Sequence, residues 1–195
     1  TDLTLWGALT VTGSQQLFLI GGLAIAVGIY TYGERVMATV GEDFGEYRLF
    51  LEGAGVDTSL MEVVPGLFTA SFFATTDQSN AQLASFYPGA MGVAARQSIL
   101  TVRPIPDLVI VSPNAPDAME KFTAECRQTK IPCLYDPSQQ ILRLDGKELI
   151  RDMQGAHFLF VNDYEFGLIA KKTCWDLAQV LQHVKVVVVT RGKEG

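Results

Sequence analysis

The sequence has 195 residues, of which 48% are hydrophobic and 18% are charged, and its formal net charge is −6. This length and composition suit one globular domain with a real core, and they exclude a disordered or collagen-like protein. The acidic balance, with a pI near 4.9, argues against a general nucleic-acid-binding protein but is compatible with a local anion site.

The N-terminal part of the chain has an unusual charge distribution. No Asp, Glu, Lys or Arg occurs between Asp2 and Glu34, and residues 17–32 are long and apolar enough to suggest a membrane span. Glycines interrupt this stretch, and no basic residue precedes it as a signal peptide would require. We therefore expect a buried strand, loop and helix here, with a membrane anchor as the alternative.

Residues from Met61 to about Gly89 favour β-structure. Two β-prone runs, Thr69–Thr75 and Gln82–Tyr87, flank the polar stretch 77–80. This arrangement predicts a β-hairpin.

Beyond Arg103, apolar strands alternate with helices. The predicted strands are 107–111, 131–135, 156–161 and 185–189, and the predicted helices are 115–129, 163–170 and 173–183, with an amphipathic segment ending at Met153. We expect Asn114 to cap the first of these helices, with Pro116 in its first turn. Continuous apolar strands between helices are typical of a parallel sheet covered on both faces, so the fold class is α/β.

Polar residues follow all four predicted strands, and ligands of open α/β sheets bind at this end of the strands. They are Ser112 and Asn114, then Asp136, then Asn162 and Glu165, and finally Thr190 and Gly192. Any one of them can be explained as a cap or a turn residue. Four such ends together indicate a ligand site.

Two of these strand ends carry more specific patterns. Asn162 and Glu165 fit either a helix capping box or an outer-sphere magnesium site. The segment from Thr190 through Gly192 to Gly195 contains a hydroxyl, glycines and basic residues, which suit close approach of backbone amides to a phosphate or nucleotide. The sequence contains no Walker P-loop pattern.

The three cysteines, Cys126, Cys133 and Cys174, are an odd number without C-x-x-C spacing. This pattern indicates neither a disulfide framework nor a zinc site. We expect reduced thiols and a cytoplasmic protein.

Several segments together resemble the ribokinase (PfkB) family of sugar and nucleoside kinases. They are Ala38–Gly45 (ATVGEDFG), Gly55–Ser59 (GVDTS), Asn162–Glu165 (NDYE) and Thr190–Gly195 (TRGKEG). Residues 69–91 are most similar to the bacterial adenosine-kinase-like branch. The resemblance implies a three-layer αβα sandwich with a mainly parallel central sheet. It also implies that residues 1–195 form one incomplete domain, with a small β-rich lid inserted at about 61–89.

The function that this resemblance implies is ATP-dependent phosphorylation of a primary hydroxyl of a sugar or nucleoside, with an adenosine-like substrate favoured. A non-catalytic nucleotide- or sugar-binding α/β module is the alternative. The expected ligands are ATP, Mg²⁺ and a small sugar or nucleoside, without nucleic acid or membrane. Because lid strands of this family can serve as dimer contacts, a homodimer through the lid is one assembly to consider.

The resemblance also assigns roles to individual residues. It implies that Glu165 acts at the metal and that Asn162, Thr190 and Gly192 bind the nucleotide. The remaining matches, Gly21, Gly22 and Phe72, are the expected substrate-binding residues: the glycine pair lets the backbone approach the sugar, and Phe72 belongs to the lid.

The sequence departs from the family pattern in three places. The G-A-G-D motif with the catalytic Asp is absent, so no catalytic base is expected in this chain and the base is expected beyond Gly195. Ala26 stands where the family has Asn, and only residues 15–20 separate the first strand from the glycine pair, where a substrate-binding Asp and lid strands are normal. We therefore expect a natural parent protein with a complete domain, and no catalysis from these 195 residues alone.

Overall fold

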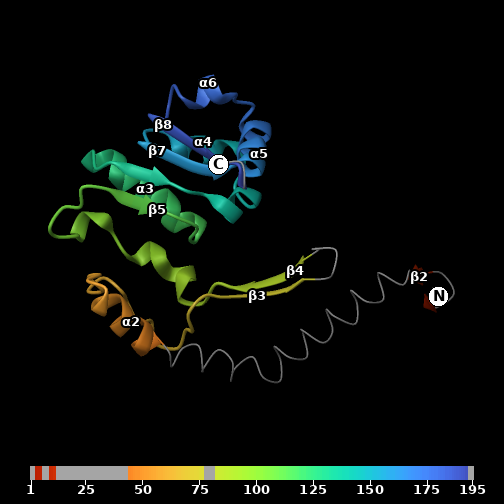
Figure 1. Cartoon of the computed structure of the whole chain (residues 1–195), viewed down its shortest axis with the longest axis horizontal. Helices are drawn as coiled ribbons and strands as arrows, with labels where there is room; N and C mark the ends of the chain where they lie inside the picture. Colours follow the sequence, from red (N-terminus) through yellow and green to blue (C-terminus); the bar gives the residue numbers. More distant parts are fainter. Residues whose placement is uncertain (1–2, 6–8, 12–43, 77–81, 193–195) are drawn as a thin grey trace. The chain divides into compact units, whose positions relative to one another are not determined.

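The computed structural model describes residues 3–5, 9–11, 44–76 and 82–192 (Figure 1). The chain divides into two compact units, Thr1–Ala90 and Met91–Gly195, called here the first and second units. In the described part, no helix has the length and apolar character needed to cross a membrane. The buried strand, loop and helix predicted for residues 17–32 lie outside the described residues. The organisation of residues 1–195 as one domain stays a prediction.

The second unit contains a four-stranded parallel sheet. Its strands are β5 (Val109–Val111), β6 (Cys133–Tyr135), β7 (Phe158–Asn162) and β8 (Val186–Thr190), and they are neighbours in this order. The connecting helices are α3 (Pro116–Thr129), η3 (Ser138–Leu142), α4 (Gly146–Met153), α5 (Asp163–Thr173) and α6 (Leu177–Val180). The predicted parallel α/β fold is therefore confirmed.

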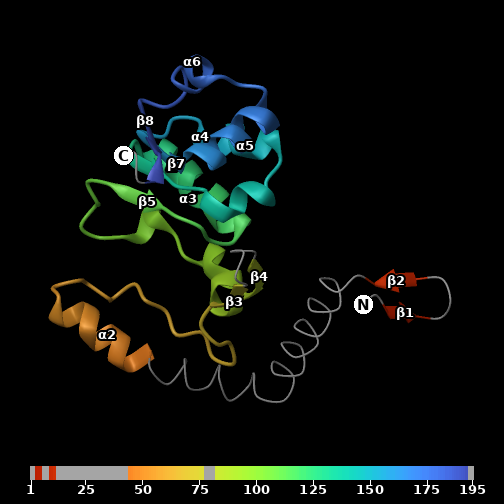
Figure 2. The same cartoon turned by 45° about the vertical axis from the view of Figure 1, so that its right-hand side comes forward.

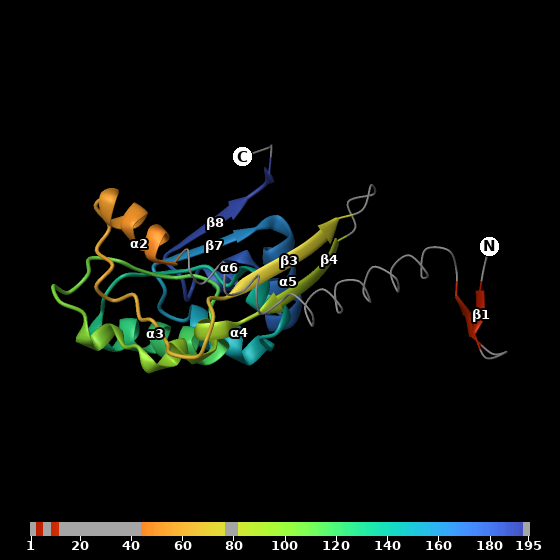
Figure 3. The same cartoon turned by 90° about the horizontal axis from the view of Figure 1, so that it is seen from below.

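The main helices of this unit lie on one face of the sheet. Each connection moves one strand in the same direction, and right-handed crossovers then place all connections on the same side. Helix α4 contacts both α3 and α5, and Figure 3 shows α3 and α4 on one side of β7 and β8. Leu159 and Tyr135 are buried on this side, while Ile110 and Val186 are exposed on the other. The second covering layer that the sequence predicts is not formed by these helices.

The start of α3 differs from the prediction. Its N-cap is Ala115, which makes no side-chain capping bond, and Pro116 is its first residue. Asn114 is not the cap, because its Oδ1 accepts from the adjacent amide of Ala115 at 2.8 Å instead of from the first turn. The helix ends at Lys130, which adopts a left-handed conformation with φ of 60°.

The prediction of one helix over residues 173–183 is also wrong. Helix α5 continues to Thr173, and Cys174 then ends it in a left-handed conformation with φ of 58°. Asp176 starts α6 with its own capping box, so only Leu177–Val180 are α-helical. Cys174 is a free thiol, as are the buried Cys126 and Cys133.

The first unit contains helix α2 (Phe44–Gly53) and two antiparallel strand pairs. The pairs are β1 (Leu3–Leu5) with β2 (Leu9–Val11), labelled in Figure 2, and β3 (Ser71–Thr76) with β4 (Gln82–Tyr87). The second pair confirms the predicted hairpin strands, while residues 77–81 between them lie outside the described part.

A glycine follows the hairpin for a clear steric reason. The amide of Ala90 donates to the Phe68 carbonyl at 2.8 Å, and Gly89 has φ of 49°. A Cβ on Gly89 would lie 2.1 Å from the same carbonyl oxygen, so only glycine fits.

Two 3₁₀ helices follow β4, η1 (Gly89–Arg96) and η2 (Ile99–Thr101), and the sequence patterns did not predict them. Glu125 of α3 holds η2, because its carboxylate accepts from the Ile99 amide at 2.7 Å and the Ser98 hydroxyl at 2.8 Å.

Candidate functional site

The carboxyl ends of the four parallel strands lie at one edge of the sheet, and the predicted polar residues follow them there. Asn162 at the end of β7 is the register partner of Thr190 at the end of β8. At the other two strands, the Asp136 amide donates to the Val111 carbonyl at 2.9 Å, which joins the ends of β5 and β6. We call Asp136, Asn162, Glu165, Thr190 and Gly192 the strand-end site.

Asn162 and Glu165 form a capping box at the start of α5. The Asn162 Oδ1 accepts from the Glu165 amide at 2.8 Å, and the Glu165 Oε2 accepts from the Asn162 amide at 2.9 Å. The interpretation of this pattern as a helix capping box is therefore confirmed. No hydrogen bond between described residues engages Glu165 Oε1, so the capping box leaves an oxygen available for a cation.

Asp136 is the second carboxylate of the site. Burial and then the negative charge of Glu165 raise the pKa of Asp136, while a hydrogen bond from the Ser138 amide opposes the rise. The effect of Glu165 means that the two carboxylates interact across the ends of β6 and β7. Two such groups brought together in a partly buried place favour a cation or a proton between them.

Two further residues shape this edge, and the sequence patterns did not single them out. Ser138 has φ of 38°, which turns the chain immediately after β6. The buried Gln140 donates from Nε2 to the Asn114 carbonyl at 2.7 Å and so ties the loops after β5 and β6 together. Pro137 and Ser138 signal a turn in the sequence, but nothing in the sequence indicates that Gln140 reaches Asn114.

Strand β8 ends at the exposed Thr190, and the loop after it reaches Gly192. Gly192 has φ of 56°, and no heavy atom lies within 4 Å of the position that its Cβ would occupy. Glycine is therefore favoured here for its conformation rather than for space. Residues 193–195 lie outside the described part.

The resemblance also predicts three substrate-binding residues, Phe72, Gly21 and Gly22. Phe72 lies on β3 in the first unit, and its side chain is exposed. Gly21 and Gly22 lie outside the described residues.

The chemistry of the strand-end site fits a hard divalent cation such as Mg²⁺, which prefers oxygen ligands and commonly uses one or two carboxylates together with waters and phosphate oxygens. Asp136 and Glu165 supply two carboxylates, and a cation would offset the burial and the repulsion from Glu165 that raise the pKa of Asp136. Among the described residues, no group of three or more His, Cys, Asp or Glu side chains is arranged to hold a metal by itself. Water and a ligand would therefore have to complete the coordination.

Comparisons with known proteins agree with the fold. Residues 9–195 match the family model described as pfkB family carbohydrate kinase. A nucleoside kinase from Methanothermobacter thermautotrophicus is 28% identical over 172 residues, which cover 82% of this chain and 53% of that protein. This chain therefore spans about half the length of the relative.

Similarity to solved structures also agrees with the fold. The nucleoside kinase of Burkholderia thailandensis in complex with inosine has a TM-score of 0.70 and 31% identity, covering 76% of this chain and 49% of that one. The same enzyme was also solved with ADP-inosine. The Methanocaldococcus jannaschii nucleoside kinase, described as an archaeal member of the ribokinase family, has a TM-score of 0.69. At 21% identity, with coverage of 80% of this chain and 52% of that one, it supports the fold alone.

Proposed function

The chain belongs to the pfkB family of carbohydrate kinases, and from this premise we propose that the full-length protein transfers the γ-phosphoryl group of ATP to a primary hydroxyl of a nucleoside or sugar. The observation that carries this proposal is the strand-end site. There, the register of β7 and β8 brings the capping box of α5 beside Thr190, and Asp136 interacts with Glu165. Such a site suits phosphoryl transfer, which depends on positioning and charge neutralisation.

In this proposal the two carboxylates bind magnesium and the β8 end binds the nucleotide. Glu165 and Asp136 hold the cation through carboxylate oxygens and water, and bound Mg²⁺ neutralises charge on the phosphates of ATP. Asn162 fixes the orientation of Glu165 through the capping box. Thr190 offers a hydroxyl to the nucleotide, and Gly192 lets the backbone approach it.

A nucleoside is the favoured acceptor, with adenosine as the first compound to test. The relatives reported above carry the name nucleoside kinase, and the Burkholderia enzyme was solved with inosine. In the same proposal, Phe72 of the β3–β4 hairpin contributes to binding of the acceptor.

The activity is tested with the full-length protein, ATP, Mg²⁺ and a panel of adenosine, inosine, guanosine, ribose and fructose. We expect ADP and a nucleoside monophosphate as products, with the nucleosides used in preference to the sugars. No product from any member of the panel would contradict the kinase proposal. Binding of ATP and a nucleoside without turnover would instead identify a non-catalytic binding module.

The metal role of Glu165 is tested by replacing it with Gln, which removes the charge and keeps the cap. Gln can complete a capping box in this protein, because Gln179 does so in α6. Titration calorimetry of Mg²⁺-ATP should show affinity lowered about 10-fold in Glu165→Gln, which is about 1.4 kcal/mol. Nucleotide binding without Mg²⁺ should change little.

Glu148→Gln is the matched control, because Glu148 occupies the same position in the capping box of α4. That box lies beside Lys172 in the last turn of α5, whereas the strand-end site lies at the first turn. The affinity of the Glu148→Gln variant for Mg²⁺-ATP should stay within about 2-fold of the wild-type affinity. Equal losses in both variants, or no loss in Glu165→Gln, would remove the assigned metal role.

A further inference from the structure

Helix η3 begins two residues after Asp136, and its first residue has an unusual backbone conformation. Ser138 has φ of 38° although it is not a glycine, and such a conformation persists only where the surrounding structure holds it. The Ser138 amide also donates a hydrogen bond to the Asp136 carboxylate. Contacts that hold the start of η3 therefore also hold this carboxylate of the strand-end site.

Gln140 fixes η3 to the loop after β5. Its Nε2 donates to the Asn114 carbonyl at 2.7 Å, and the residue is buried. Its main chain stabilises the same turn, because the amide donates to the Pro137 carbonyl at 2.9 Å and the carbonyl accepts from the Leu144 amide at 3.0 Å. Gln140 thus joins the turn after β6 to the end of a different strand.

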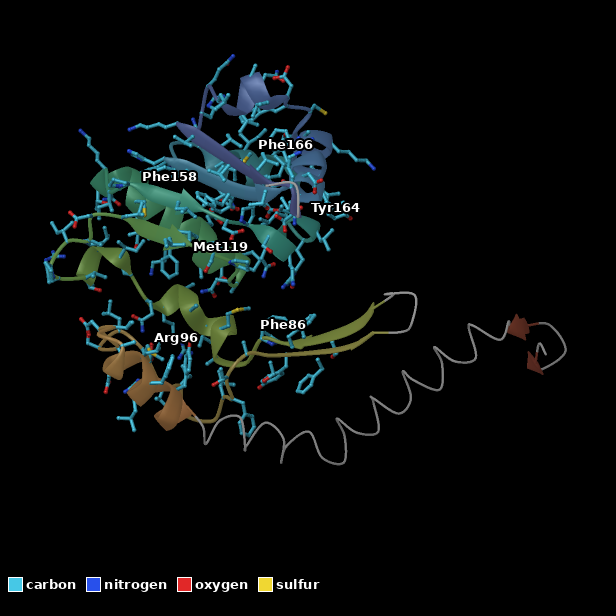
Figure 4. The ribbon with its side chains drawn as sticks, in the orientation of Figure 1. Phe86, Arg96, Met119, Phe158, Tyr164 and Phe166 are labelled. Carbon is cyan, nitrogen blue, oxygen red and sulfur yellow. The ribbon has the colours of Figure 1, made fainter. Side chains whose placement is uncertain are left out.

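The residue that accepts this bond is itself held in place. The Asn114 amide donates to the Sδ atom of Met119 at 3.4 Å. Met119, labelled in Figure 4, is a fully buried residue of α3. The Asn114 carbonyl is therefore a firm point of attachment for Gln140.

The end of η3 has a separate attachment. Lys172, in the last turn of α5, donates from Nζ to the Ile141 carbonyl at 2.6 Å. Loss of the Gln140 bond would therefore free the start of η3, near Asp136, while its end stays attached to α5. We expect a variant of Gln140 to fold for this reason.

The side-chain amide of Gln140 is only partly satisfied. Its Oε1 is buried and has no hydrogen-bond partner among the described residues. An unpaired buried acceptor offsets much of the stability that the Nε2 bond contributes. A gain in stability alone therefore explains this glutamine poorly, and the place of its bond, between two strand ends, points to a role at the site.

We propose that Gln140 is a positioning residue, which holds η3 against the loop after β5 so that the Asp136 carboxylate is kept in place to bind magnesium together with Glu165. This inference rests on the proposed kinase function, and it adds a buried residue that acts through Asp136 instead of contacting the metal itself. The effect of Gln140 should therefore depend both on Mg²⁺ and on the Asp136 carboxylate.

The first test replaces Gln140 in the full-length protein by Met, which keeps the length of the side chain and removes the donor. Titration calorimetry should show that Gln140→Met lowers the affinity for Mg²⁺-ATP about 5-fold, while the affinity for ATP without Mg²⁺ stays within about 2-fold. Gln140→Asn, whose amide is too short to reach the Asn114 carbonyl, should give the same result. Unchanged affinity for Mg²⁺-ATP in both variants would overturn the inference.

Arg127→Met is the matched control. Arg127 makes a bond of the same kind, from Nη1 to the Arg151 carbonyl at 2.8 Å, and it joins the ends of α3 and α4 at the opposite edge of the sheet. Its affinity for Mg²⁺-ATP should stay within about 2-fold of the wild-type affinity. Equal losses in Arg127→Met and Gln140→Met would overturn the inference, because both would then act through general stability.

A double variant tests whether Gln140 acts through Asp136. In an Asp136→Asn background, Gln140→Met should change the affinity for Mg²⁺-ATP by less than about 2-fold, because the carboxylate that it positions is already lost. A further loss of about 5-fold would show that the two residues act independently and would overturn the inference.

Hydrogen exchange in the absence of metal gives a readout that needs no ligand. The Ser138 amide should exchange faster in Gln140→Met than in the wild type, and its exchange should not change in Arg127→Met. An unchanged rate for Ser138 in Gln140→Met would contradict the attachment of η3 through Gln140.

The same measurements separate this inference from the kinase proposal. If the wild type binds Mg²⁺-ATP but phosphorylates no acceptor, and Gln140→Met lowers that binding only when Asp136 is present, the positioning role stands while the kinase proposal fails. If the wild type phosphorylates a nucleoside and Gln140→Met has the same dependence on Mg²⁺, the kinase proposal stands and the positioning role fails. If the wild type does not bind Mg²⁺-ATP, both fail.

Discussion

The two units of the chain use apolar residues in different ways. Among the described residues, every apolar side chain of the buried core belongs to the second unit, where the sheet packs against its helices. Among the residues of the first unit whose burial the structure describes, only Thr58 is buried, while Leu49, Phe50, Phe72 and Phe86 are exposed. The same residue types therefore stabilise one unit and form the surface of the other.

This difference shows what holds each unit together. In the second unit, burial of continuous apolar strands supplies the main stabilisation, as expected for a parallel sheet. In the first unit, the described contacts include local hydrogen bonds, such as those from Thr58 to Glu52 and from Arg48 to the Met61 carbonyl at 2.6 Å, and the backbone pairing of the hairpin. Exposed apolar residues of the first unit are available to a ligand, whereas those of the core are not.

The largest expected effect is at the core of the second unit. Leu159→Ala removes a fully buried side chain and should lower the free energy of unfolding by about 2 to 5 kcal/mol. The control Leu49→Ala, at a residue 68% exposed, should change it by less than about 0.5 kcal/mol. Urea unfolding of the full-length protein measures both, and comparable losses would show that the apolar surface of α2 is buried in that protein.

A smaller and more local effect is expected at the hairpin. Gly89→Ala should lower the free energy of unfolding by about 1 to 2 kcal/mol because alanine is strained in the left-handed conformation. The clash of the added methyl group with the Phe68 carbonyl should lower it further. Hydrogen exchange should become faster in β3 and β4 and stay unchanged in β5–β8. Gly55→Ala is the control, because Gly55 has φ of 82° without any atom near the added methyl group. If Gly89→Ala costs no more than Gly55→Ala, the close approach to Phe68 has no energetic importance.

The smallest expected effect concerns Asp136 and depends on pH. In the folded state the pKa of Asp136 lies above its ordinary value of 3.8. The native protein therefore binds this proton more tightly than the unfolded chain does. The stability from this group is complete below that pH and is lost as the pH rises through the raised pKa. Asp136→Asn should therefore gain stability over the wild type as the pH rises above the ordinary value of 3.8, and this gain should be smaller than the effects of Leu159→Ala and Gly89→Ala.

Asp145 provides a control of opposite sign. A hydrogen bond from the Glu148 amide lowers its pKa, so its contribution is present above the ordinary value and is lost as the pH falls. Asp145→Asn should thus be destabilising at neutral pH and approach the wild type in acid. Denaturation curves at several pH values test both signs, and a gain for Asp136→Asn that does not grow with pH would contradict the raised pKa of Asp136.

Much of the second unit could be predicted because its signals are local. Apolar runs between amphipathic segments predicted the strands of the sheet, and the Asn162–Glu165 spacing predicted the observed capping box. The errors also have local causes, since Asn114 bonds to the adjacent amide of Ala115, and Cys174 ends α5 in a conformation that favours glycine. Periodicity detects neither event, because each depends on the conformation of one residue.

By itself, the sequence determined the alternation of strands and helices, the hairpin strands, the polar residues after each strand and the resemblance to the family. Only the tertiary structure decided that Asn162 lies beside Thr190, that Asp136 interacts with Glu165, and that Phe72 is paired with Phe86. The physical reason is that local patterns depend on neighbours within a few residues along the chain. Register and charge interactions depend on backbone hydrogen bonds and packing between distant segments, and these exist only once the chain has folded.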